Sequence, residues 1–75
     1  MKKKIIYTRQ GMSRTSGNTW LTDEYSVIEE NEKGYKVILD YTNDPMSEEV
    51  KGGVYEITKH NIAWNYEMNV VEIKD

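Results

Sequence analysis

Short stretches of alternating apolar and polar residues recur along the chain and predict β-strands. The clearest stretch is residues 35–41, YKVILDY, which places four large side chains on one face. That face carries Tyr35, Val37, Leu39 and Tyr41, and the opposite face carries Lys36, Ile38 and Asp40. The preceding Asn31-Glu32-Lys33-Gly34 predicts a hairpin turn, in which Gly34 can adopt a positive φ.

Shorter apolar runs predict further strands on both sides of this hairpin, at residues 3–8, 25–30 (starting as early as residue 20), 54–57, 62–66 and 70–73. Residues 9–18 are rich in Gly, Ser, Thr and Asn and predict a long loop. Residues 58–61 predict a tight turn or one 3₁₀ turn. Apolar positions change from even to odd numbers near residues 69–71, which indicates a bulge or a break there.

The connection at residues 43–53 carries signals of a short helix. Asp44 is a suitable N-cap, Pro45 fits the first helical position, and Gly52 or Gly53 can end the helix. We therefore expect one or two helical turns within residues 44–51.

Length and composition place these elements in one small all-β domain spanning residues 1–75. Ile, Val, Thr, Tyr and Trp, the residues with high strand preference, dominate the apolar and β-branched set, with only two Leu and one Ala. Short strands in a chain of 75 residues predict a small, strongly bent sheet or a partly open Src-homology-3-like (SH3-like) barrel with one short helical insertion. The expected core consists of Tyr35, Val37, Leu39, Tyr55, Ile57 and Ile62.

Charge is distributed unevenly along the chain. Residues 1–16, a basic arm and loop, contain five Lys and Arg and no acid, whereas residues 17–75, the acidic body, contain all 13 acidic residues and five Lys. The net charge of -3 therefore combines two regions of opposite sign.

Three interpretations of the charge pattern stay open. The acids can be a solvated surface, partly neutralised by the basic strand beside them. They can imitate the phosphates of DNA and occupy a basic groove of a host protein. The basic arm can instead bind nucleic acid, with Tyr7, Trp20 or Tyr25 as stacking platforms. Under the second interpretation, the partner-binding residues are Asp23, Glu24, Glu29, Glu30, Glu32, Asp40, Asp44, Glu48 and Glu49.

Aromatic residues exceed what one small core needs. Trp20, Tyr41, Trp64, Tyr66 and Met68 are the surplus side chains, and surplus aromatics favour an interface. The interface candidates are Trp20, Trp64 and Tyr66. We expect a homodimer that uses Trp64, Tyr66 and the edge of the last strand.

The sequence gives little support for catalysis. His60 is the only histidine, Cys is absent, and no serine lies in a nucleophile-elbow context. Spacings typical of calcium loops and phosphate loops are missing, so neither a metal site nor a cofactor is expected. No apolar run approaches a membrane span or a signal-peptide core, which predicts a cytoplasmic protein.

The stretch DEYSVIEENEKGYKVILD and the later GGVYEITKHNIAW resemble small SH3-like barrel proteins of Gram-positive bacteria and their phages. In those proteins a Y-x-V strand and a glycine-turned hairpin precede a turn similar to Tyr55–Lys59. The size and charge style are similar to short acidic phage proteins that take over host machinery, for example inhibitors of the DNA sliding clamp in DNA replication. The resemblance implies a non-enzymatic inhibitor with a DNA-mimicking surface. An alternative function is that of an adaptor subunit in a larger complex.

Overall fold

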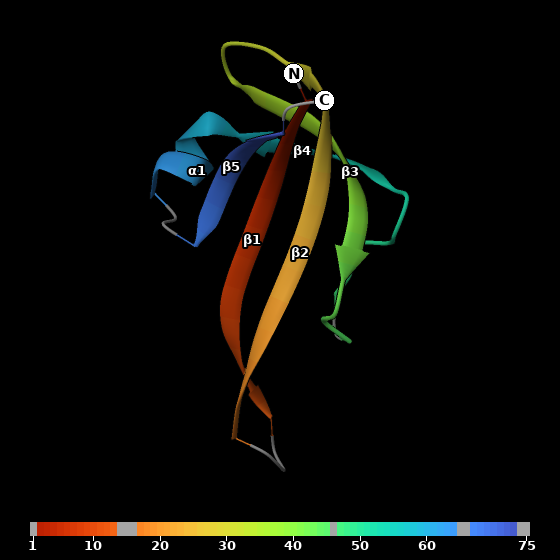
Figure 1. Ribbon diagram of the computed structural model, residues 1–75, viewed down its shortest axis with the longest axis vertical. Coiled ribbons are helices and arrows are strands. Elements are labelled where there is room, and N and C mark those ends of the chain that lie inside the picture. The colour runs from red at the N-terminus through yellow and green to blue at the C-terminus, as the bar shows by residue number, and fades with distance from the viewer. Residues whose placement is uncertain (1, 14–16, 46, 65–66, 74–75) are drawn as a thin grey trace.

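The computed structural model describes residues 2–13, 17–45, 47–64 and 67–73. The fold is all-β apart from one short helix (Figure 1), in the order β1 (Lys2–Ser13), β2 (Gly17–Glu30), β3 (Gly34–Thr42), β4 (Val54–Thr58), α1 (Lys59–Trp64) and β5 (Met68–Ile73). All strand pairs are antiparallel and form one sheet in the order β4-β3-β2-β1-β5. The first strand of the chain therefore lies inside the sheet, with a neighbour on each side.

Strong bending brings the two edges of this sheet toward the same core. Ile57 on β4 and Val70 on β5 lie at opposite edges, yet both pack in one hydrophobic cluster. Two register shifts between β2 and β3 leave Ile28 and Asp40 as extra residues and increase the local twist. The sheet remains unclosed, and this bent, partly open architecture is the one that the sequence predicts.

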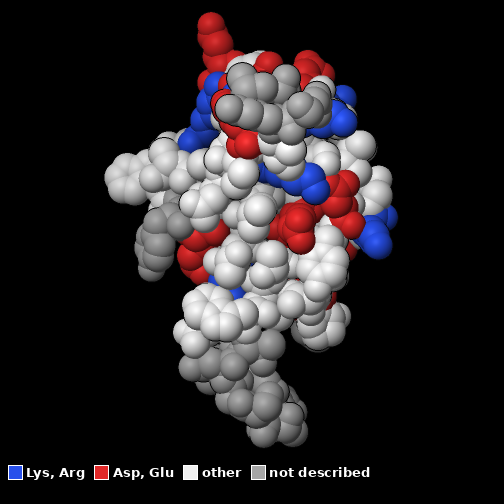
Figure 2. Space-filling model, in the orientation of Figure 1, with Lys and Arg blue, Asp and Glu red and all other residues white. Residues whose placement is uncertain are grey.

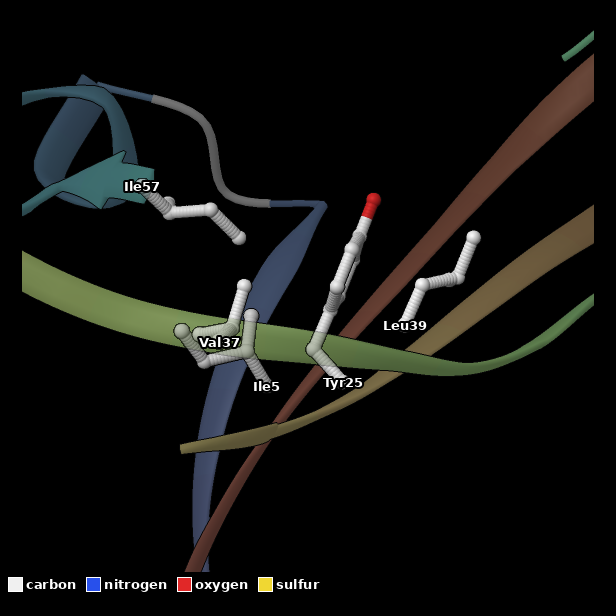
Figure 3. Packing of buried hydrophobic residues seen from close by; sticks show 5 residues of the cluster. All are labelled: Ile5, Tyr25, Val37, Leu39 and Ile57. Atoms are coloured by element: carbon white, nitrogen blue, oxygen red, sulfur yellow. The ribbon is translucent and has the colours of Figure 1, made fainter. Parts of the chain in front are cut away.

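The core is small and lies on the concave face. Its buried side chains come from the first four strands: Ile5, Tyr25, Val37, Leu39 and Ile57. Figure 3 shows these five side chains, two of which, Val37 and Leu39, come from β3. Val37, Leu39 and Ile57 were expected in the core, and the expected Tyr35, Tyr55 and Ile62 are half-buried against it. The alternation of apolar and polar residues in β3 therefore predicts correctly that the face with Val37 and Leu39 points into the core.

A long β1–β2 ribbon replaces the loop predicted for residues 9–18. The pairing of β1 with β2 continues from Lys4↔Ser26 to Ser13↔Gly17. β3 ends at Thr42, opposite Asp23, so beyond this level only two strands continue. We call residues 9–13 and 17–22 the ribbon. It lies at the lower end of the molecule in Figure 1. The longest dimension of the molecule is 41 Å.

The β2–β3 turn has the predicted position but a different role for its glycine. Asn31 Oδ1 accepts hydrogen bonds from the backbone N–H groups of Lys33 and Gly34. Among the described residues, only Gly52 has a positive φ, of 86°. Gly34 is needed for a close approach instead, because a Cβ there would collide with the carbonyl oxygen of Ile57 on β4.

The short helix lies later in the chain than the sequence predicts. The described residues of the 44–51 segment form turns and bends, whereas Lys59–Trp64 forms α1. The hydroxyl oxygen of Thr58 caps α1 by accepting a hydrogen bond from the Asn61 N–H. The predicted strand over 62–66 is therefore wrong at residues 62–64, and residues 65–66 lie outside the described part.

The bulge or break predicted near residues 69–71 is also wrong. β5 pairs with β1 in one uninterrupted register from Lys2↔Ile73 to Tyr7↔Met68. The change in apolar spacing arises because α1 follows a helical period, after which a new strand begins.

Replacement of the buried Leu39 by alanine should destabilise the domain strongly. The side chain is fully buried, so Leu39→Ala should lower the free energy of unfolding by roughly 2–5 kcal/mol. Tyr41→Ala, on an exposed position of the same strand, should change it by less than about 1 kcal/mol. Urea denaturation of both variants measures the difference, and equal effects would show that the packing of β3 is wrong.

Candidate interaction surface

A buried ionic network lies where the sheet narrows to the ribbon. The Arg9 guanidinium donates to Asp23 Oδ2 at 3.0 Å and to Asp44 Oδ2 at 2.6 Å. The side chains of Arg9, Asp23 and Asp44 are only 18%, 6% and 17% exposed. Burial lowers the pKa of Arg9, but the hydrogen bonds to the two carboxylates raise it overall. These three residues, which we call the arginine network, join β1, β2 and the β3–β4 connection.

Neighbouring side chains complete this end of the concave face. Thr42 donates its hydroxyl hydrogen to the second oxygen of Asp23, and Arg9 stacks 4.6 Å above the ring centre of Tyr7. The Tyr25 hydroxyl donates to Glu49 at 2.6 Å and thereby holds the β3–β4 connection. Burial, followed by this hydrogen bond, raises the pKa of Tyr25 well above its ordinary value. The polar groups here are satisfied within the chain.

A second ionic group lies at the other end of the concave face. Glu30 accepts hydrogen bonds from Lys3 at 2.7 Å and from Lys59 at 2.9 Å. Lys59 also lies 5.4 Å from the ring centre of Tyr35. The hydrogen bond from Lys3, and then the one from Lys59, lower the pKa of Glu30 below its ordinary 4.5. This group ties β1 and β2 to the start of α1.

A third contact crosses the convex face. Asp40 accepts a hydrogen bond from the Ser26 hydroxyl, and the Lys4 ammonium lies 3.6 Å from the same carboxylate oxygen. Three basic residues of the predicted basic arm, Lys3, Lys4 and Arg9, are therefore paired with acids of the body. This arrangement matches the interpretation in which the two halves of the sequence neutralise each other.

The structure thus separates the nine predicted partner-binding acids into two groups. Five make contacts within the chain: Asp23, Glu30, Asp40, Asp44 and Glu49. The others make no hydrogen bond or ion pair within the described residues, and we call them the free carboxylates: Glu24, Glu29, Glu32 and Glu48. Glu24 is half-buried and the other three are exposed.

Two of the free carboxylates line a hollow of about 650 Å³ between the β2–β3 turn and β4. Glu29 and Glu32 share its rim with Lys33 and Lys36, so the hollow is of mixed charge. Figure 2 shows the same mixture on a larger scale, with acidic and basic atoms side by side rather than in a single acidic field. A continuous row of carboxylates is absent from the face that the figure presents.

Large apolar side chains remain exposed outside the core. Trp64, at the end of α1, is 79% exposed, and the His60 ring lies at a centroid distance of 6.0 Å from its ring. Trp20, on the ribbon, is 64% exposed. Tyr66 lies outside the described residues. Trp20 and Trp64 are therefore exposed, and their role in an interface stays a prediction.

Sequence reasoning missed the structural role of Arg9 and the burial of Ile5 and Tyr25. Ile5 lies in a strand that was predicted, but an inner position in the sheet cannot be read from a run of only three apolar residues. Arg9 and Asp44 are 35 positions apart in the chain, and only the fold brings them together. The sequence offered only a weak signal, because Arg9 is one of two arginines, with Arg14, in the predicted loop at residues 9–18.

No protein-family model, curated protein or solved structure matches this chain. Within the described ranges, no helix combines the length and apolar character that a membrane crossing requires. Those ranges also contain no group of three His, Asp or Glu side chains placed to hold a metal ion. The interaction surface is therefore interpreted from its own geometry.

Removal of the Arg9 charge should cost about 3–5 kcal/mol of unfolding free energy, because Arg9→Met leaves Asp23 charged and buried without a counter-ion. The double variant with Asp23→Asn should recover part of the loss. Lys51→Met, at an exposed position, is the matched control and should leave stability unchanged. Chemical denaturation measures all three, and a stable Arg9→Met variant would show that the network is not structural.

Acid should weaken the contact between β1, β2 and α1. Because the pKa of Glu30 is lowered in the folded state, its contribution is complete above the ordinary value of 4.5 and is lost as the pH falls through the folded value. Glu30→Gln should therefore reduce the fall in melting temperature between neutral and acidic pH. A Glu32→Gln control should retain the wild-type pH profile, and an unchanged profile in Glu30→Gln would contradict the assignment.

Proposed function

We propose that this protein is a non-enzymatic binding domain that acts on another protein. The observation that carries the proposal is the exposure of Trp20 and Trp64 on a domain whose buried charges are satisfied internally. Exposed tryptophans supply large contact areas with little loss of side-chain entropy, and they are enriched among residues that dominate binding energy. The ribbon adds a narrow projection that a cleft of a partner can receive.

The charge of the domain favours a partner with a basic surface, but it contributes less to affinity than the exposed aromatics do. The free carboxylates and the net charge of -3 favour encounter with a positively charged surface, while each exposed ion pair adds only ~0.2–1 kcal/mol. In this proposal the aromatics provide affinity and the acids provide steering. Inhibition of a host nucleic-acid-handling protein such as a sliding clamp is the narrower form, and it rests on the sequence resemblance.

Direct binding of nucleic acid is the second candidate, and the ion pairs weigh against it. Lys3, Lys4 and Arg9 are engaged with carboxylates, so a nucleic acid would have to replace these contacts. The acidic remainder of the chain also repels phosphate. A steep loss of DNA binding with salt is the signature that this alternative requires.

The test uses purified sliding clamp from a Gram-positive bacterium as the probe, with binding measured by calorimetry at several salt concentrations. Trp20→Ala with Trp64→Ala should abolish binding. The free-carboxylate variant Glu29→Lys, Glu32→Lys, Glu48→Lys should slow association and weaken its salt dependence. Tyr41→Ala is the control for loss of an exposed aromatic, and it should bind like the wild type.

Each outcome separates the forms of the proposal. Absence of clamp binding would remove the narrower form, and the same variants would then be compared on a partner captured from lysate. If the carboxylate variant loses binding and the tryptophan variant keeps it, acidic mimicry contributes most of the binding energy. Binding to duplex DNA that requires Lys2, Lys3 and Lys4 would overturn the proposal in favour of the nucleic-acid alternative.

A further inference from the structure

β5 forms an edge of the sheet. It pairs with β1 along Met68–Ile73, and no described strand lies on its other side. An edge strand presents a row of N–H and C=O groups that another extended strand can pair with.

The hydrogen-bonding direction along β5 follows from one contact. The Thr8 N–H donates to the Glu67 carbonyl at 3.0 Å, immediately beyond the Tyr7↔Met68 pair. Because hydrogen-bonded and non-hydrogen-bonded pairs alternate in an antiparallel ladder, Asn69 and Val71 direct their backbone groups toward β1. The intervening residues, Met68, Val70 and Glu72, then direct theirs outward.

The sequence of β5 has few of the features that normally protect an edge, and its one charged residue, Glu72, lies next to the end of the strand rather than at its centre. MNVVEI contains no proline and no lysine, and its register with β1 has no bulge. Val71 and Ile73 remain 39% and 38% exposed. The other edge, β4, has only five residues, ends directly at α1, and carries Glu56 at its centre, which would face its own copy in a symmetric pair.

We propose that the β5 edge pairs antiparallel with β5 of a second copy, about a two-fold axis at Val71. In this register Val71 faces Val71 of the other copy in a non-hydrogen-bonded pair, where side chains approach closely. On each side of this pair, Val70 of one copy faces Glu72 of the other, and their outward backbone groups form hydrogen bonds. A register centred on Glu72 would oppose two carboxylates. A register centred on Val70 would place the two Val70 residues in a hydrogen-bonded pair, where side chains lie farther apart, and would put Val71 opposite Asn69 instead of its own copy.

Oligomeric state tests this pairing first. Sedimentation equilibrium of the full chain should show a concentration-dependent dimer. Val71→Lys places two like charges opposite each other and should raise the dissociation constant at least roughly tenfold. Val54→Lys is the matched control, because Val54 is an exposed valine of the β4 edge, and it should dimerise like the wild type. Circular dichroism and melting temperature check that both variants fold.

A cysteine variant tests the register. The chain contains no cysteine, so Val71→Cys introduces the only thiol. The opposed Cα atoms of a non-hydrogen-bonded pair lie about 4.5 Å apart, within disulfide range. Mild oxidation should therefore give a covalent dimer with Val71→Cys and little with Val54→Cys. A wild type that stays monomeric at high concentration, a dimer unaffected by Val71→Lys, or equal cross-linking of both cysteine variants would overturn the proposal.

Discussion

The arginine network is the interaction on which the arrangement of this molecule depends. Arg9, Asp23 and Asp44 come from β1, β2 and the β3–β4 connection, and they meet at the point where β3 stops and the ribbon continues. The described residues provide a core of five buried apolar side chains, which is small for a domain of this length. The network adds directional contacts at the open end of the sheet, where few apolar groups are available, and it fixes the base from which the ribbon projects.

The same charges explain why the surface is less acidic than the sequence suggests. β1 lies between β2 and β5, so Lys3, Lys4 and Arg9 form ion pairs with acids of the neighbouring body. These ion pairs neutralise part of the predicted basic arm and part of the predicted acidic body at the same time. The exposed groups of the described residues then include scattered carboxylates, lysines and large apolar side chains, and affinity for a partner is more readily obtained from the apolar side chains.

The fold class and the β2–β3 hairpin were predictable because their signals are local. Alternation in β3 and the Asn31–Gly34 turn identify strand, face and turn within about a dozen neighbouring residues. The ribbon was not predictable, because its stability comes from backbone pairing between residues that show no apolar alternation. The placement of α1 at 59–64 rather than within 44–51 reflects tertiary context: Lys59 bonds to the Lys33 carbonyl, and Ile62 packs on the core.

The candidate site was predictable only in part, for a related reason. Exposure of Trp20 and Trp64 follows from a core too small to hold every aromatic residue, which composition already indicates. The fate of each carboxylate depends instead on which strands are adjacent. Asp23 and Glu24 are consecutive, yet strand alternation places the first in the buried arginine network and leaves the second a free carboxylate.

Strand direction determines how the two proposed contacts would combine. β1 pairs with β5 through residues 2–7, and the ribbon begins only at residue 9, so pairing at the β5 edge leaves the ribbon and Trp20 uncovered. In an antiparallel pair of β5 strands the two copies of β1 also run in opposite directions. The two ribbons would then project from opposite ends of one continuous sheet. Such a dimer can hold two partner molecules apart, and it gains avidity only from a target whose binding sites are spaced to reach both ribbons.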